Sequence, residues 1–91
     1  MAIQFYQRGI IDDMPSKLVV DEGEIPFAGL VDTLCGEYGT HVKKSIITED
    51  GELKDGLMLI VNGRIFKRKD VLSLVISDGS VVMVSIILAG R

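Results

Sequence analysis

Apolar and polar residues alternate at the start of the chain and predict a strand over residues 2–7. Ile3 and Phe5 fall on one face of this strand and are expected to point inward. A turn segment over 9–16 leads to a second short strand over 17–21. The first two strands are therefore expected to form a hairpin.

The spacing of apolar residues becomes helical after Pro26, which suits the first turn of a helix because its missing N–H needs no partner there. Gly39 suits the C-terminal cap. Cys35, the single cysteine, falls within the apolar stripe and is expected to be a buried structural thiol. The stripe consists of Phe27, Leu30, Val31, Leu34, Cys35 and Tyr38.

The region that follows has no single period, and residues 41–47 fit either a short helical turn or an irregular strand. Residues 57–61 are strongly apolar and predict a strand. Asn62 and Gly63 then indicate a tight hairpin, because both central residues of such a turn need positive φ. The returning strand is expected over 64–67.

The last strand begins after a turn over 77–80, and residues 71–76 before it fit either a helical turn or an extended segment. The first and last strands are both apolar and suit the centre of a sheet. A lone helix among strands must bury its stripe on one sheet face. We therefore expect an α+β, two-layer fold in which a mixed sheet packs on one main helix, as a single domain over 1–91.

Alternation along the last strand sorts its side chains onto two opposite faces. Val82, Val84 and Ile86 share one face, and the family resemblance given below implies that this face points inward. An apolar, methionine-rich patch is expected on the outer sheet face, where it would serve as a docking surface or as a self-association face. Its expected members are Met58, Ile60, Val81, Met83 and Ile87.

Composition restricts the function classes. The chain has 91 residues, 47% of them apolar, and a net charge of -3, which fits one globular domain and argues against nucleic acid binding. No apolar segment approaches the roughly 20 residues that cross a bilayer, so no membrane partner is expected. With one cysteine and no leader pattern, a cytoplasmic location is expected.

The sequence contains no pattern typical of a catalytic or metal site. His41 is the single histidine and has no cysteine or carboxylate at ligand spacing, so a structural or solvent role is expected. No glycine-rich phosphate loop is present. We expect no catalytic residue, no metal and no bound cofactor in this chain.

Small residues follow the last strand. Leu88, Ala89 and Gly90 precede Arg91, and a slim flexible tail over 88–91 would fit a narrow cleft because glycine has no Cβ. Such a tail is typical of a carrier whose reactive group is its terminal carboxylate.

Together these features resemble the MoaD/ThiS family of sulfur carriers, which are small ubiquitin-like proteins with the β-grasp fold. The resemblance rests on the order of elements, the hairpin over 59–64, the turn at Asp78 and Gly79, and the tail over 88–90. The extra segment over 40–56 favours the molybdopterin-synthase small-subunit type, and a tungsten-cofactor or protein-modifying role is equally compatible.

The resemblance implies that the chain is not itself an enzyme. An E1-like partner would use Mg-ATP to adenylate the terminal carboxylate, and sulfur would displace AMP to leave a thiocarboxylate. The sulfur would then pass to a molybdopterin or tungstopterin precursor with the molybdopterin synthase large subunit, or to the thiamine thiazole with thiazole synthase. Gly90 and Arg91 would form the transfer tail, and Leu88 and Ala89 would join the partner-binding surface.

The sequence departs from the family pattern. Arg91 stands where the family has its last glycine, Ser80 stands where an acidic residue is common, and apolar residues at 86–88 replace the usual prolines. Three explanations of Arg91 remain open: a peptidase removes it, a partner is adapted to it, or the chain binds partners without being activated. The last explanation gives the rival function, a β-grasp interaction module that regulates or stabilises a partner enzyme.

Overall fold

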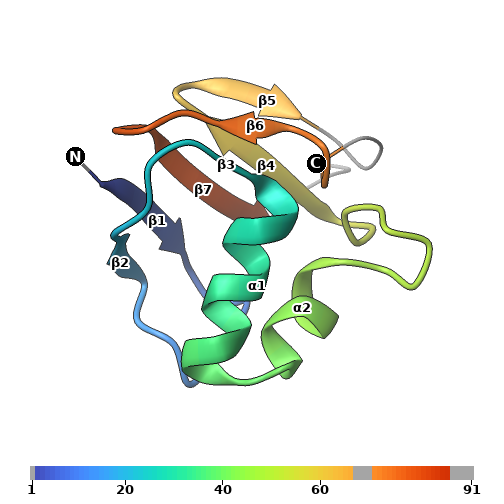
Figure 1. Ribbon diagram of the computed structural model, residues 1–91. Helices are drawn as coiled ribbons and strands as arrows, with labels where there is room; N and C mark the ends of the chain where they lie inside the picture. Colours follow the sequence, from blue (N-terminus) through green and yellow to red (C-terminus); the bar gives the residue numbers. More distant parts are fainter. Residues whose placement is uncertain (1, 67–70, 87–91) are drawn as a thin grey trace.

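The computed structural model describes residues 2–66 and 71–86. Within them, five strands form one sheet in the order β2-β1-β7-β4-β5. β1 and β7 are parallel and the other neighbours are antiparallel, so the sheet is mixed and its central strand is the last one (Figure 1). The strands are β1 (Ile3–Gln7), β2 (Lys17–Val20), β4 (Leu57–Val61), β5 (Arg64–Phe66) and β7 (Val81–Ile86).

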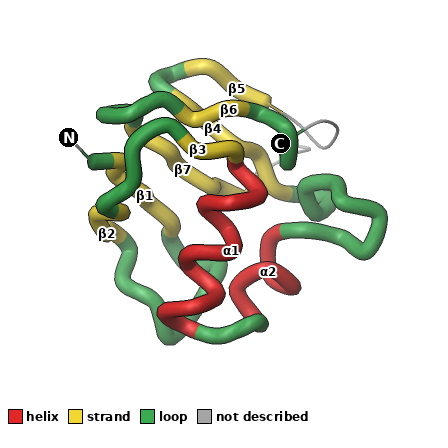
Figure 2. Tube along the Cα trace, viewed as in Figure 1, coloured by secondary structure: helices red, strands yellow, loops and turns green. Residues whose placement is uncertain are grey.

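Two helices form the second layer. α1 spans Phe27–Tyr38 and α2 spans His41–Ile46. Figure 2 shows both helices on the same side of the five-stranded sheet. A small second sheet pairs β3 (Ile25–Pro26) with β6 (Val75–Ile76). The predicted α+β, two-layer architecture is confirmed, and the undecided segment over 41–47 is largely helical.

The core lies between α1 and the inner face of the sheet. α1 contributes the predicted stripe positions Phe27, Leu30, Val31 and Leu34, all buried. Full burial of one such side chain stabilises the fold by about 1.5–3 kcal/mol relative to exposure. Opposite them lie the inward-facing residues of three strands, namely Ile3, Phe5, Leu57, Leu59, Val82 and Val84.

The start of α1 is stabilised by a distant segment of the chain. Pro26 is the N-cap, one position before the first turn, and it makes no side-chain capping bond. The first free amides of a helix need partners from outside it. Phe27 N–H donates to the carbonyl of Leu74 at 2.8 Å, and Ala28 N–H donates to that of Leu72 at 3.1 Å. The segment over 71–76, which has no clear period, thus covers the helix start.

Two predictions about burial need correction. Alternation predicts Ile86 in the core beside Val82 and Val84, but 47% of its surface is exposed. Alternation gives the side of the sheet on which a side chain lies, and it does not show whether a helix covers that end of the strand. Cys35 is half-buried rather than buried, although it packs against the core. Gly39 does follow α1 with a positive φ of 113°.

The predicted hairpin turn is present and is tied to the last strand. Asn62 and Gly63 have φ values of 52° and 85°. The Asn62 side chain accepts a hydrogen bond from Val81 N–H at 2.9 Å and donates one to Ser80 Oγ at 3.1 Å. The β4–β5 hairpin is thereby fixed to the start of β7.

Candidate functional site

One row of paired side chains crosses the whole face of the sheet that the helices do not cover. Directly paired residues of neighbouring strands lie on the same face. The register pairs Lys17 with Tyr6, Tyr6 with Met83, Met83 with Ile60, and Ile60 with Ile65. We call this surface the open face; it is continuous from β2 to β5.

The open face is apolar and accessible. Val81 is 38% exposed and Met83 is 37% exposed, while Met58 and Ile60 are half-buried. The structure thus places these four predicted residues on adjacent strands of one face, and their role in binding stays a prediction. The other expected members of the site, Ile87, Leu88, Ala89, Gly90 and Arg91, lie outside the described residues.

Sequence reasoning missed two exposed residues of the same face. Val19 and Ile65 are 61% and 57% exposed, more than the predicted members. Ile65 lies directly opposite Ile60 across the tight turn. The two-residue turn predicted for this hairpin would have been enough to identify it, since that turn fixes the register. Val19 lies in line with Val81 through Gln4 of β1.

Polar groups at the β2 side of the open face orient Tyr6. Its hydroxyl donates to Gln4 Oε1 at 2.9 Å. Lys17 Nζ lies 5.7 Å from the centroid of the Tyr6 ring, a contact worth about 0.5–1 kcal/mol at an exposed position. The open face therefore has a cationic and hydrogen-bonding border on β2 and β1, and an apolar centre on β7 and β4.

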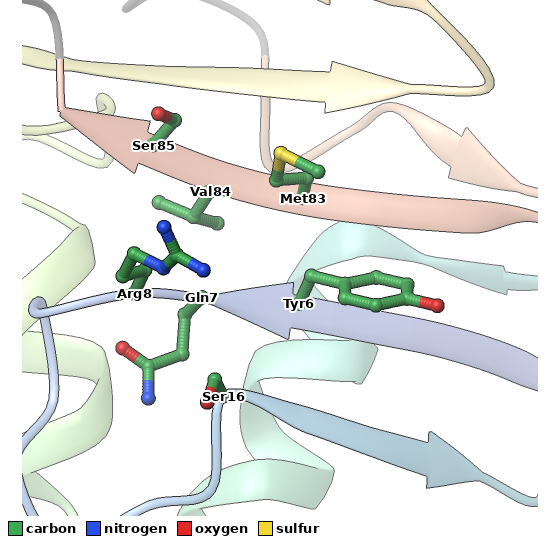
Figure 3. Close-up of a pocket in the computed structure, with 7 residues that line it drawn as sticks. All are labelled: Tyr6, Gln7, Arg8, Ser16, Met83, Val84 and Ser85. Atoms are coloured by element: carbon green, nitrogen blue, oxygen red, sulfur yellow. The ribbon is translucent and has the colours of Figure 1, made fainter.

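A hollow of about 370 Å³ lies where β1 and β7 end side by side. Figure 3 shows seven residues around it, with Met83, Val84 and Ser85 on β7 and with Tyr6 and Gln7 on β1. The others, Arg8 and Ser16, belong to the β1–β2 loop. An apolar thioether, a guanidinium and hydroxyl groups together can hold a partner's apolar side chain beside a carboxylate.

Gln7 forms one wall of this hollow, and hydrogen bonds hold its side chain in place. Its side chain is buried, and its Oε1 accepts hydrogen bonds from the N–H groups of Ile10 and Ile11 at 3.2 and 3.0 Å. Its Nε2 lies within 3.2 Å of three carbonyl oxygens, those of Ile11, Met14 and Pro15. Sequence reasoning missed this residue. The available signal was an amide at an inward-facing position of an alternating strand.

His41 lies away from the open face. Its Nε2 is 2.8 Å from Asp13 Oδ1, and both side chains are largely exposed. The hydrogen bond with His41 lowers the pKa of Asp13 from its ordinary value of 3.8. This contact joins the start of α2 to the β1–β2 loop. Across residues 2–66 and 71–86, no three His, Cys, Asp or Glu side chains group in a way that could hold a metal ion.

The helices of the described residues lack the length and apolar character that a bilayer crossing requires.

Comparison with known proteins identifies the fold. No family model and no curated protein sequence matches the chain. The crystal structure of SAMP1 from Haloferax volcanii aligns over 100% of both chains, with a TM-score of 0.64 and 18% identity. The solution structure of Urm1 from Trypanosoma brucei aligns over 99% of this chain and 95% of its own, with a TM-score of 0.67 and 19% identity.

The solution structure of the HVO 2177 protein from Haloferax volcanii aligns over 100% of this chain and 87% of its own. Its TM-score is 0.63 at 19% identity. Identities this low establish a shared fold, so assignment to the MoaD/ThiS branch stays a prediction. The element order, the mixed sheet and these neighbours agree, and the chain has the ubiquitin-like β-grasp fold.

Proposed function

We propose that the protein is a ubiquitin-like carrier whose C-terminal carboxylate is activated by an E1-like enzyme and converted to a thiocarboxylate. The observation that carries this proposal is the open face, where a row of side chains runs across all five strands and is apolar on β7, β4 and β5. Exposed apolar patches on small domains mark partner surfaces. One solved protein with the same fold is named small archaeal modifier protein 1.

The chemistry requires activation because a carboxylate is a poor electrophile. A carboxylate oxygen forms a bond to the α-phosphorus of ATP, and pyrophosphate leaves. A sulfur nucleophile then attacks the acyl carbon, and AMP leaves with the oxygen. A hydrosulfide donor gives the thiocarboxylate directly, whereas a persulfide donor leaves an acyl disulfide that a thiol must reduce. ATP and magnesium belong to the activating partner in this scheme.

In this scheme the chain contributes binding and presentation. The open face, centred on Met83 and Ile60, would dock on the activating enzyme, and the hollow beside Arg8 would hold a side chain of that enzyme. The small residues Ala89 and Gly90 would let the carboxylate reach the nucleotide. The final acceptor we propose is a molybdopterin or tungstopterin precursor held by a synthase large subunit, with thiazole synthase as the alternative.

A second candidate function is a non-activated interaction module that uses the same open face to regulate or stabilise an enzyme. Arg91 favours it, because a long and permanently charged side chain would lie beside the carboxylate to be activated. The two functions share the docking surface and differ only in whether the carboxylate reacts.

The test is mass spectrometry of the C-terminal peptide of the native protein, purified from cells that are making the molybdopterin or tungstopterin cofactor. An oxygen-to-sulfur exchange at the terminal residue supports the carrier, and loss of Arg91 with it shows that trimming comes first. An unmodified terminal carboxylate on Arg91 overturns the proposed carrier function and supports the interaction module.

Docking is tested separately with purified E1-like enzyme, ATP and magnesium. Met83→Lys is expected to reduce the rate of adenylate formation at least tenfold, because it puts a charge in the centre of an apolar interface. Val75→Lys is the matched control, since Val75 is 52% exposed and lies on β6 in the second sheet. Equal rates for both variants would contradict a role of the open face.

A further inference from the structure

The edge strand β2 leaves backbone groups free for a partner. β2 is the first strand in the sheet order and pairs only with β1 among the described residues. Gln7 N–H donates to the carbonyl of Ser16 at 2.9 Å. Because hydrogen-bonded and non-bonded pairs alternate along an antiparallel ladder, the N–H and C=O of Lys17 and Val19 point away from β1. An extended chain can pair with such an edge.

A groove of about 300 Å³ lies beside this edge, between β2 and α1. Leu18 packs against the core yet remains partly exposed in the groove, and Leu34 of α1 lies across from it. The groove is lined by Leu18, Val19, Val20, Asp21, Glu22, Thr33, Leu34 and Glu37. An added strand would place alternate side chains over this groove and beside the exposed Val19.

The negative charge around the groove favours a partner segment with basic residues on either side of its apolar part. Its lining contains three carboxylates, those of Asp21, Glu22 and Glu37, and no basic side chain. Lys17 is close in sequence, but its ammonium lies over the Tyr6 ring on the open face. The net charge of -3 adds to the attraction of a cationic segment.

We propose that β2 and this groove bind an extended apolar segment of a partner protein, flanked by lysine or arginine residues. The backbone edge supplies hydrogen bonds, the partly exposed Leu18 contacts the apolar side chains, and the carboxylates pair with the flanking cations. This surface is separate from the activation chemistry and leaves the centre of the open face free. The protein would thus hold two partners at once.

The probe is a synthetic, end-capped peptide with a central run of valine and isoleucine between lysines. Titrated into the labelled full-length protein, it is expected to shift the amide resonances of Lys17, Val19 and Asp21 most strongly. Amides in the centre of the open face, such as that of Met83, are expected to change little. A peptide with glutamates in place of lysines is expected to bind at least tenfold more weakly.

Two sets of variants test the charges and the backbone edge. Glu22→Lys combined with Glu37→Lys is expected to weaken binding about tenfold at low ionic strength, because the variant removes two ion pairs with the flanking cations and adds repulsion. Glu24→Lys with Glu49→Lys changes the net charge equally, but at positions outside the groove, and is expected to have a much smaller effect.

Val19→Pro removes an N–H that points away from β1, so an edge strand should tolerate it, whereas peptide binding should be lost. Val19→Thr keeps that N–H and is expected to bind normally. If Val19→Pro fails to fold, the two charge variants still decide. The proposal would be overturned by resonance shifts centred on Met83, or by equal binding of the lysine and glutamate peptides. It would also be overturned if the β2 resonances shifted with protein concentration in the absence of peptide, because a second copy of the chain would then be the occupant.

Discussion

The buried amide of Gln7 organises the loop between β1 and β2. It accepts from two backbone N–H groups and lies within hydrogen-bonding distance of three carbonyls. A buried backbone group that loses its partner costs about 1–3 kcal/mol. The loop therefore depends on one side chain in place of regular secondary structure, and this dependence can be measured.

Gln7→Leu is expected to lower the free energy of unfolding by about 3 kcal/mol, since several backbone groups lose their partners while the apolar volume is kept. Urea unfolding followed by circular dichroism measures the change. Gln4→Leu is the control, because Gln4 is half-buried and accepts one bond from Tyr6. A similar loss for both variants would show that the hydrogen bonds of Gln7 have no special role.

The contact between Asp13 and His41 predicts that folding stability falls at acid pH. The pKa of Asp13 is lowered from 3.8, first of all by its hydrogen bond with His41. A lowered folded-state pKa adds stability above the unfolded value, and this stability disappears as the pH falls through the lowered value. In an NMR titration, His41→Ala is expected to raise the pKa of Asp13 toward 3.8. An unchanged pKa would contradict the contact.

The main helix tests how local propensity and packing combine. Gly36 lies in α1, and a Cβ at that position would meet open space, whereas a Cβ at Gly29 would lie 2.8 Å from Ile25 Cγ1. Alanine at an open helical position stabilises by about 0.5–1 kcal/mol relative to glycine. Gly36→Ala is therefore expected to raise the free energy of unfolding.

Gly29→Ala gains the same propensity but forces Ile25 to move, so it is expected to lower the free energy of unfolding. Thermal unfolding of both variants gives the comparison. If both variants were stabilised equally, the close packing of β3 on α1 would not be a constraint.

Elements with a clear period or turn were predictable, and short ones were not. α1 and the hairpin at Asn62 and Gly63 followed from local signals that tertiary structure did not override. α2 has only six residues, and β6 has two, which extend because they pair with β3. That pairing is a contact between distant segments, and a local pattern does not contain it.

The same distinction applies to the candidate site. Met58, Ile60, Val81 and Met83 could be assigned to one face from alternation alone. The groove between β2 and α1 could not be predicted, because it depends on how far the helix lies from the edge strand. Its lining combines residues from two elements that the sequence separates by a loop.

The order of strands predicts which parts of the sheet unfold locally and which unfold only with the whole molecule. In the part of the chain that the structure describes, β1 and β7 lie inside the sheet with partners on both sides, whereas β2 has one partner. Native-state hydrogen exchange is expected to be slowest for amides that join β1 to β7, close to the rate of global unfolding. The amide of Val19, which points away from β1, is expected to exchange orders of magnitude faster. Protection of Val19 in the free protein would show that the edge is already covered.

The parallel pairing of β1 with β7 also has a mechanical consequence. Ile3 begins β1 at one end of the sheet, and Ile86 ends β7 at the other end (Figure 1). A force that pulls these two residues apart runs along both strands, so it loads their shared hydrogen bonds together in shear. Traction on β5, an edge strand, would instead open the β4–β5 bonds one after another. The protein should therefore resist a force applied at Ile3 and Ile86 far better than a force that pulls β5 away from the sheet.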